Sequence, residues 1–419
     1  MRGIWRPRRL AASEKGACRE LWEEIFVEDS KEFLDYYDRW KYAENECYGI
    51  FDGERLVSMM QLNPYEMQIK GAVPVKSRYI IAVATREEYR HRGMMAALLK
   101  ESLGGMRRQG MPFAFLMPAA EAIYHPFGFR YFYESNVGML KLCEEDGTKS
   151  GTGLSVRSAV PSDIPGLAAF AEEIQPELFD CYTRRDSHYY EMLLCELATE
   201  AGGLLLLTEP ETVDSGEPGG QREEKTGNHR RIVSAVPYWG VDSVEIREIL
   251  CRPADKGRVL SALGRWFGDG RAGKRPKQVS VVGAAFELEK KKPVIMGRIA
   301  DAVSFLELFA SDRPMEVFLE LSDELLEDNC GIYRWSLSPR GSLAERIAPP
   351  EGQLLRAAEA LPAGEAAGDG SRKAGDVLCP ERIRMTAAEL FSCLMGGAEP
   401  EGALGKVRRC GKSYINEIV

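Results

Sequence analysis

The hydrophobic pattern changes its period within residues 80–99. Residues 80–84, IIAVA, form an apolar run of the length of a buried strand, whereas Met94 and Leu98 fall at helical spacing. Between them, residues 86–93 read REEYRHRG and contain three arginines and one glycine. The pattern therefore predicts a buried strand that passes through a basic turn directly into a helix.

The neighbouring patterns extend this segment into a mixed α/β order. Residues 14–26, EKGACRELWEEIF, have helical spacing. Residues 47–71 predict two strands that turn at Asp52 and Gly53, and residues 112–118, PFAFLMP, predict one more strand. A polar, glycine-rich segment then predicts a domain boundary.

The next block repeats the order of two strands followed by a helix. Residues 202–211, GGLLLLTEPE, and the apolar residues 232–251 predict a hairpin, and residues 257–268 predict a helix. This block has no counterpart of the basic turn.

The last block mixes helices and strands. Its first stretch, VIMGRIADAVSFLELF at residues 294–309, has the spacing of an amphipathic helix, and residues 315–324 and 330–338 predict strands. A further helix begins near Thr386, whose spacing to Glu389 is that of a capping box.

Composition narrows the class of protein. A chain of 419 residues exceeds what one hydrophobic core usually supports, so two or three domains are expected. The formal net charge of -9 argues against a nucleic-acid partner and favours cationic small molecules or peptides. The ten cysteines include no C-x-x-C pair, which argues against a metal site and fits a reducing cytoplasm. No segment approaches the roughly 20 apolar residues of a membrane span, so no span is expected.

The basic turn is the strongest candidate for a binding site. Backbone N–H groups at the end of a strand, followed at once by a helix N-terminus, attract an anion through geometry and dipole together. The amides that would face a pyrophosphate belong to Arg90, His91, Arg92, Gly93 and Met94. The turn is neither a Walker loop nor a G-x-G-x-x-G motif. The alternative is a basic helix N-terminus on a solvated surface.

The R-x-x-G pattern from Arg90 to Gly93, with IYHPFGF at residues 123–129, resembles the acetyl-CoA core of the GNAT acetyltransferases. The resemblance implies acetyl-CoA as cosubstrate and N-acetyl transfer as the reaction. Met95 stands where many members of the family have Gly or Ala. The implied cofactor-binding residues are Ile81, Ala82, Val83, Ala84, Arg90, His91, Arg92, Gly93, Met94 and Met95.

The same resemblance assigns the general acid. In GNAT enzymes a tyrosine before a Gly-Phe pair sits beside the coenzyme sulfur, which implies Tyr124 in this chain. A phenol with a pKa near 10 stays protonated at neutral pH and can give its proton to the sulfur. His125 is an alternative base or simply part of a turn. For Tyr131 and Tyr133, packing is the stronger interpretation.

The whole chain resembles the enhanced-intracellular-survival (Eis) acetyltransferases. This resemblance implies an α+β or mixed α/β chain with two GNAT folds in tandem, each a mixed twisted sheet flanked by helices. A sterol-carrier-like α/β domain would follow them. The implied base is the α-carboxylate of Val419, and a hexamer is implied as well. The implied domains are a catalytic GNAT domain at 1–150, a degenerate GNAT-like domain at 151–292 and a sterol-carrier-protein-like domain at 293–419.

Eis relatives acetylate aminoglycosides and lysine-containing peptides, so the implied acceptor is an amine of a cationic small molecule or peptide. Carboxylates and aromatic rings that suit such an amine occur early in the chain. The candidates are Trp22, Glu28, Asp29, Tyr36, Tyr37 and Trp40. Two alternatives remain open: a non-catalytic protein that binds CoA or lipid, and a sensor of acetyl-CoA.

Overall fold

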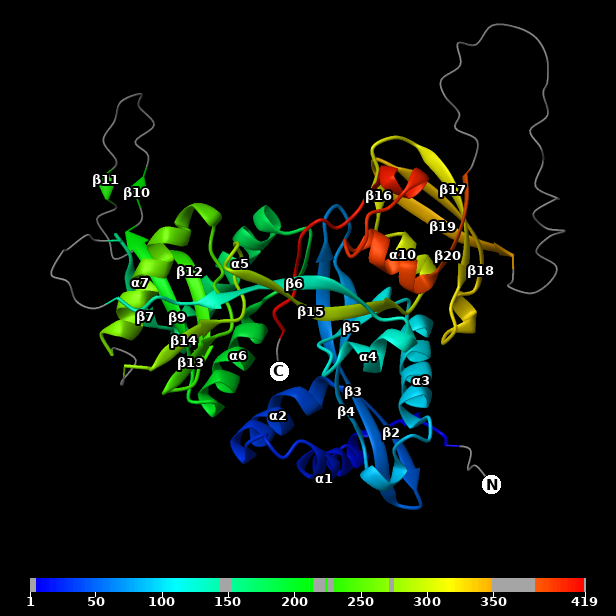
Figure 1. Cartoon of the computed structure of the whole chain (residues 1–419), viewed down its shortest axis with the longest axis horizontal. Coiled ribbons are helices and arrows are strands. Elements are labelled where there is room, and N and C mark those ends of the chain that lie inside the picture. Colours follow the sequence, from blue (N-terminus) through cyan, green and yellow to red (C-terminus); the bar gives the residue numbers. More distant parts are fainter. Residues whose placement is uncertain are drawn as a thin grey trace, which may run out of the picture. The chain divides into compact units, whose positions relative to one another are not determined.

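The computed structural model describes residues 5–143, 152–210, 212–213, 223–224, 230–270, 275–348 and 381–417. The chain divides into two compact units, and Figure 1 labels their elements. Unit 1 comprises Met1–Val27, Glu44–Tyr133 and Ile295–Ser413. Unit 2 comprises Glu28–Ala43, Glu134–Val294 and Tyr414–Val419. The division into three domains stays a prediction.

Unit 1 contains a mixed sheet in the order β1-β2-β3-β4-β5-β15. Neighbouring strands are antiparallel except for the parallel pair β4 and β5. The strands are β1 (Arg8–Arg9), β2 (Glu46–Asp52), β3 (Arg55–Ile69), β4 (Val75–Thr85), β5 (Phe113–Leu116) and β15 (Lys290–Ile299), of which residues 295–299 belong to this unit. The helices of its first part are α1 (Gly16–Ile25), α3 (Met94–Arg108) and α4 (Glu121–Tyr124).

The sequence predicted most of these elements correctly. The β2–β3 hairpin turns after Asp52, and Gly53 has the left-handed φ of 60° that such a tight turn requires. Helix α1 lies within the predicted residues 14–26 and buries one face, with Leu21 and Trp22 at 0% and 3% exposure. Its amphipathic spacing therefore corresponds to a buried face.

The predicted amphipathic helix at residues 294–309 was wrong. Residues up to Ile299 form the end of β15, and only the short helix α8 (Ala302–Leu306) follows. Residues 295–299 are all buried and pair antiparallel with β5. A continuous apolar run in a central strand lacks the alternation that distinguishes a strand from a helix, so the spacing alone was ambiguous.

A second sheet in unit 1 has the order β19-β18-β17-β20. Its strands are β17 (Met315–Ser322), β18 (Gly331–Ser338), β19 (Gly341–Ala348) and β20 (Glu381–Thr386), and a separate pair joins β16 (Ala310–Ser311) to β21 (Val407–Arg408). The capping box that begins α10 (Ala387–Leu394) is confirmed, since Glu389 N donates to Thr386 Oγ1 and Thr386 N donates to the Glu389 carboxylate. Both predicted strands of this region, at 315–324 and 330–338, are present.

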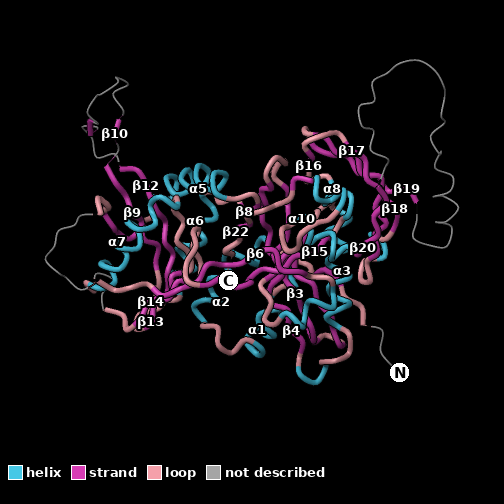
Figure 2. The backbone as a smooth tube through the Cα atoms, turned by 45° about the horizontal axis from the view of Figure 1, so that its top comes forward, coloured by secondary structure: helices cyan, strands magenta, loops and turns pink. Residues whose placement is uncertain are grey.

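Unit 2 contains a sheet in the order β6-β14-β13-β12-β9-β7. Its strands are β6 (Arg130–Met139, from Glu134), β7 (Ser155–Ser158), β9 (Gly203–Pro210), β12 (Arg230–Trp239), β13 (Ser243–Ile246) and β14 (Gln278–Val281); the short strands are β8 (Cys181–Thr183), β10 (Thr212–Val213), β11 (Glu223–Glu224) and β22 (Ser413–Tyr414). The helices are α2 (Lys31–Glu44, to Ala43), α5 (Ile164–Leu178), α6 (Ser187–Thr199) and α7 (Lys256–Gly268). The predicted hairpin is the antiparallel pair β9–β12, and α5 and α6 pack against it (Figure 2).

The order of elements along the chain repeats. Two helices are followed by β2, β3, β4, α3 and β5 in the first half, and two helices are followed by β9, β12, β13, α7 and β14 in the second. In both series the last two strands are parallel and a helix connects them. The architecture is a mixed α/β fold with a large mixed sheet flanked by helices.

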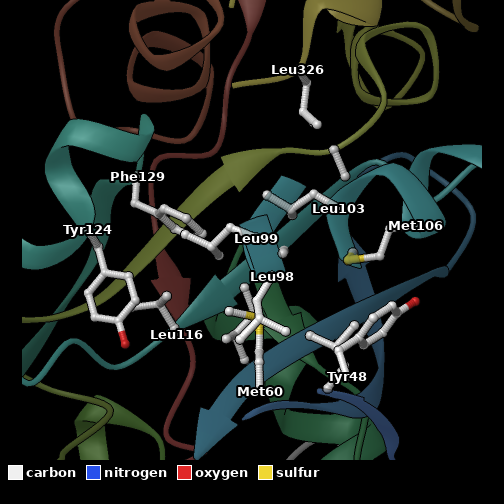
Figure 3. Close-up of a cluster of buried hydrophobic side chains, with 14 of the residues drawn as sticks. Tyr48, Met60, Leu98, Leu99, Leu103, Met106, Leu116, Tyr124, Phe129 and Leu326 are labelled. Carbon is white, nitrogen blue, oxygen red and sulfur yellow. The ribbon is translucent and has the colours of Figure 1, made fainter. Parts of the chain in front are cut away.

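Each unit has its own hydrophobic core. In unit 1, α3 packs Leu98, Leu99 and Leu103 onto the sheet, and each of these side chains is fully buried (Figure 3). Full burial of a leucine stabilises the fold by about 1.5–3 kcal/mol. None of the helices in the described part of the chain is both long and apolar enough to span a membrane.

Candidate active site

The basic turn has a backbone shape that suits an anion. Gly93 has φ 80° and ψ 11° and caps α3, and His91 has φ 61°. Glycine adopts this left-handed conformation without the steric cost that a Cβ brings. Apart from neighbouring parts of its own backbone, no atom of the described residues lies within 4 Å of the position that a Cβ on Gly93 would occupy, so the space at this position is open. The first amides of a helix have no carbonyl partner within it and are therefore available to a ligand.

The side chains of the turn add positive charge to these amides. Arg90, His91 and Arg92 are exposed. Arg90 Nε donates to the Thr85 carbonyl at 3.2 Å, and Arg92 Nη2 donates to the Glu88 carbonyl at 2.5 Å. These contacts orient both guanidinium groups without neutralising them, because their acceptors are carbonyl oxygens. The predicted turn and its position after β4 and before α3 are therefore found.

A β-bulge lies in the strand that leads to the turn. Met59 of β3 pairs with Ala84 and Gln61 pairs with Ile81, so β4 has one residue more than β3 between these pairs. Ala82 has φ 50°, a left-handed value that costs a non-glycine residue roughly 1–2 kcal/mol. Strain of this kind is concentrated at functional sites. The residues predicted to bind the cofactor, 81–84, span the bulge.

The parallel strands β4 and β5 separate beside the bulge. Their ladder consists of Arg78 paired with Ala114 and Tyr79 paired with Phe115, although β4 continues to Thr85. On its other side, β5 pairs along all four of its residues with β15. Ligands of α/β sheets bind where the carboxyl ends of strands diverge. The end of the ladder at Tyr79, the bulge between Ile81 and Ala84, and the turn that ends at Gly93 follow one another along the chain.

Tyr124 lies at the end of α4, inside the core of unit 1. Its side chain is 8% exposed, and its ring makes an edge contact with Phe129 at 5.8 Å between centroids. Figure 3 shows the ring beside Leu116, with the hydroxyl directed away from Phe129. The same cluster contains Ile80 of β4 and Met94 of α3, so β4, α3 and Tyr124 share one core. The strand before the turn and the helix after it therefore share a core with the candidate acid.

Burial sets the protonation of Tyr124. Its desolvation raises the pKa to about 12, because the phenolate would lose its hydration. Over the described ranges its hydroxyl makes no hydrogen bond to another residue, and desolvation is the cause of its pKa shift. A neutral phenol in an apolar setting can give a proton or a hydrogen bond to a developing anion.

The other candidate residues close to Tyr124 in the sequence differ in how far they are buried. His125 is exposed and lines a cavity of about 400 Å³, together with Arg130, Arg298 and Asp323. Tyr131 is half-buried and Tyr133 is 4% exposed, which fits packing. The described residues include no cluster of three or more His, Cys, Asp or Glu side chains that could hold a metal ion.

Several predicted residues are not assembled into a site. Val419 lies outside the described residues. Among the six candidates for amine binding, three are interior packing residues: Trp22, Tyr36 and Tyr37 are 3%, 6% and 0% exposed. Tyr36 donates its hydroxyl to Glu196 at 3.1 Å. Glu28 is exposed, and Asp29 and Trp40 are half-buried.

Sequence reasoning missed a buried group of charged residues in unit 2. Arg185, Arg247, Glu248 and Glu417 are each at most 5% exposed. The available signal was the adjacent pair of opposite charges, Arg247 and Glu248, between apolar residues on both sides in IREIL at residues 246–250.

Comparison with known proteins agrees with this geometry. Residues 6–132 match the family model of an acetyltransferase (GNAT) domain. An uncharacterized N-acetyltransferase of Streptomyces avermitilis is 26% identical over 121 residues, which are 28% of this chain and 29% of that protein. The matched segment thus spans less than a third of that relative.

Two solved structures share the fold over nearly the whole chain. A GCN5-related N-acetyltransferase from Anabaena variabilis has a TM-score of 0.65 at 16% identity and covers 97% of this chain and 94% of its own. Eis1 from Mycobacterium abscessus has a TM-score of 0.62 at 14% identity and covers 99% of both chains. The two solved structures show a shared fold, and the family match covers residues 6–132. The part of the chain that is similar in sequence to GNAT acetyltransferase domains, residues 6–132, thus contains the basic turn, the bulge and Tyr124.

Proposed function

We propose that this protein is an acetyl-CoA-dependent N-acetyltransferase that acts on an amine of a cationic small molecule or a lysine-containing peptide, by direct transfer in a ternary complex. The observation that supports the proposal is the common core of β4, α3 and Tyr124, which joins the strand and the helix on either side of the basic turn to a neutral phenol. The net charge of -9 favours a cationic acceptor.

The residues present fit acetyl-CoA, which supplies an activated acetyl thioester. The open backbone at Gly93, with Arg90 and Arg92 beside it, would hold the pyrophosphate. The unpaired edge of β4 at residues 81–84 would hold the pantetheine arm through backbone groups. Ala82 is buried and left-handed, so this edge is fixed in place before binding.

Tyr124 and Val419 divide the proton transfers in this proposal. An attacking amine must lose a proton and the leaving sulfur must gain one. Tyr124 Oη carries the proton for the sulfur, and the α-carboxylate of Val419 accepts the proton of the amine. The sterol-carrier-like character of residues 293–419 and a hexameric assembly are further parts of the proposal that rest on the resemblance alone.

Thiol release from acetyl-CoA with a panel of amines tests the activity. We expect turnover with a multi-amine cation and a fall in kcat of about tenfold or more for Tyr124→Phe, since general acid catalysis contributes about 10²–10⁴-fold. Tyr131→Phe is the matched control, because it removes a hydroxyl from a half-buried tyrosine of the same region and should retain kcat.

Two results would contradict the proposal. If Tyr124→Phe keeps wild-type kcat, Tyr124 is not the acid. If the protein binds acetyl-CoA but releases no thiol with any amine, a protein that binds or senses CoA is the better description.

A further inference from the structure

A cavity of about 400 Å³ lies in unit 1 against the segment that follows Tyr124. Its walls are residues 125–128 and Arg130, the end of β17 with the loop at 322–325, and the beginning of α10 at 386–388, together with Arg298 of β15. This volume is in the range of sites that bind small molecules. None of residues 90–95 lines the cavity, so its walls are distinct from the basic turn.

Two arginines fix the wall that follows Tyr124. Arg130 Nη1 donates to the carbonyl oxygens of His125 and Phe129, at 3.1 and 2.8 Å. Arg298 Nη1 donates to the carbonyl oxygen of Phe127 at 2.6 Å. Alternate carbonyl groups of residues 125–129 are thus bound by side chains that line the cavity. The wall therefore has its shape before any ligand binds.

The charge of Arg298 is balanced within the protein. Arg298 Nη2 binds both carboxylate oxygens of Asp323, each at 2.6 Å. Both side chains are 3% exposed. A buried arginine with a bidentate carboxylate partner is a complete ion pair. Arg298 therefore brings little net charge to the cavity.

The charge of Arg130 is not balanced in this way. Its hydrogen bonds in the described part of the chain go to carbonyl oxygens through Nη1, and it makes no ion pair there. The side chain is half-buried, and burial lowers the pKa of Arg130, whereas Glu389 and Glu121 raise it. Both of these glutamates are exposed, so water screens their attraction. Arg130 is therefore a partly desolvated cation whose Nε and Nη2 groups have no acceptor among the described residues.

The free edge of Arg130 suits a carboxylate. Nε and Nη2 of a guanidinium form a planar fork that matches two carboxylate oxygens. A dianion would bring a second negative charge toward Asp323 and Glu324, which also line the cavity, so a monoanion is favoured.

The rest of the lining suits a hydrocarbon group. Its apolar members are Pro126, Phe127, Leu325, Ala387 and Ala388. Apolar walls with a few polar groups that fix orientation are typical of small-molecule sites. The cavity thus combines one unbalanced cation with an apolar surface.

We propose that this cavity binds a small organic monocarboxylate, whose carboxylate accepts from Arg130 Nε and Nη2 and whose hydrocarbon part packs against Phe127 and Leu325. The inference does not depend on acetyl transfer, because it concerns binding alone. It assigns unit 1 a second ligand besides acetyl-CoA.

The test measures benzoate binding to the full chain by isothermal titration. We expect benzoate to bind wild type and Arg130→Gln to weaken its Kd by about tenfold or more, because charge-assisted hydrogen bonds are lost. Arg346→Gln is the matched control and should keep the wild-type Kd. Arg346 is an exposed arginine of the same unit that also donates to a backbone carbonyl, that of Cys330, and it does not line the cavity.

A second variant leaves Arg130 in place. Ala388→Leu adds volume at the cavity wall, and leucine is well accepted in helices. It should also weaken benzoate binding by about tenfold or more, since the hydrocarbon part loses its space. Thermal unfolding checks that each variant is folded, and Ala388→Leu serves if Arg130→Gln is not.

Three further probes separate this proposal from its competitors. Inorganic phosphate and benzylamine should each bind more weakly than benzoate, and Arg90→Gln should keep the wild-type Kd for benzoate. Phosphate that binds as tightly as benzoate would overturn the carboxylate class, and tighter binding of benzylamine would show that Glu324 dominates instead. Benzoate binding that is lost in Arg90→Gln but kept in Arg130→Gln would place the anion at the basic turn. Absence of benzoate binding to wild type would overturn the site itself.

Discussion

Two residues in left-handed conformations shape the basic turn and the strand that leads to it: Gly93 in the turn and Ala82 in the bulge of β4. Gly93 adopts φ 80° without steric cost, whereas Ala82 adopts φ 50° against the preference of its Cβ. The sequence allowed Gly93 to be recognised, because a glycine between a strand and a helix is a local signal. It gave no signal for the conformation of Ala82, since a bulge depends on the register between β3 and β4.

Gly93→Ala should raise KM for acetyl-CoA by about fivefold or more, because a Cβ disfavours the left-handed backbone by roughly 1–2 kcal/mol and displaces the amides. Gly71→Ala is the matched control. Gly71 has φ 84° and, like Gly93, no atom within 4 Å of a Cβ position. Both variants should lose similar stability in thermal unfolding, but only Gly93→Ala should bind acetyl-CoA more weakly. Equal KM values in the two variants would contradict an anion-binding role for the turn.

The pKa of Tyr124 predicts the basic side of the pH profile. Burial raises the pKa to about 12, so the phenol keeps its proton as the pH rises through the usual value near 10. Between about pH 7 and about pH 10, kcat should not fall through ionisation of this group. The measurement is kcat across this range in wild type and Tyr124→Phe. A decline centred near pH 10 in wild type that is absent from Tyr124→Phe would show that the phenol ionises normally.

At the scale of elements, the order of strands and helices along the chain was easier to predict than whether a buried apolar segment forms a strand or a helix. The strand, turn and helix around residues 80–99 could be predicted because the period changes visibly there. Residues 294–309 could not, because Ile295, Met296 and Ile299 suit a buried strand and a buried helix alike. Pairing of β15 with β5 decided between them.

Gly297→Ala distinguishes the two structures. In a helix this change would stabilise by about 1 kcal/mol. In β15 the new Cβ would stand 2.4 Å from Phe391 Cζ and 3.0 Å from Phe132 Cε1, so we expect destabilisation by about 1–3 kcal/mol. Gly104→Ala in α3, where the nearest atom outside the helix backbone is Nη1 at the far end of the exposed Arg108 side chain, at 3.5 Å, should instead stabilise. Thermal unfolding of both variants gives the comparison, and an increase in Tm for Gly297→Ala would count against the strand.

At the scale of the whole molecule, the two similar series of elements differ between their parallel strands: the first series has the basic turn, and the second does not. The absence of a second basic turn was visible in the sequence. The buried charges around Glu417 were not, because they come from residues far apart in the chain, such as Arg185, Glu248 and Glu417. Such contacts depend on tertiary structure, which neither periodicity nor local motifs encode.

Acetyl-CoA should therefore bind once per chain. The first series has diverging parallel strands and an open turn, whereas β13 and β14 remain paired through Ile249 and Gly283. Isothermal titration should give a stoichiometry near one, and Gly93→Ala should weaken that single event. A second event that persists in Gly93→Ala would show that unit 2 binds the cosubstrate as well.

The closed strands of unit 2 have a thermodynamic consequence. A ligand stabilises the folded form in proportion to the logarithm of its concentration over Kd, and only the part of the protein that binds it gains directly. Because the bonds that close β13 and β14 belong to the chain itself, their contribution to unit 2 does not vary with the supply of any metabolite. Fluctuations in cellular acetyl-CoA should thus alter the resistance of unit 1 to heat and proteases far more than that of unit 2.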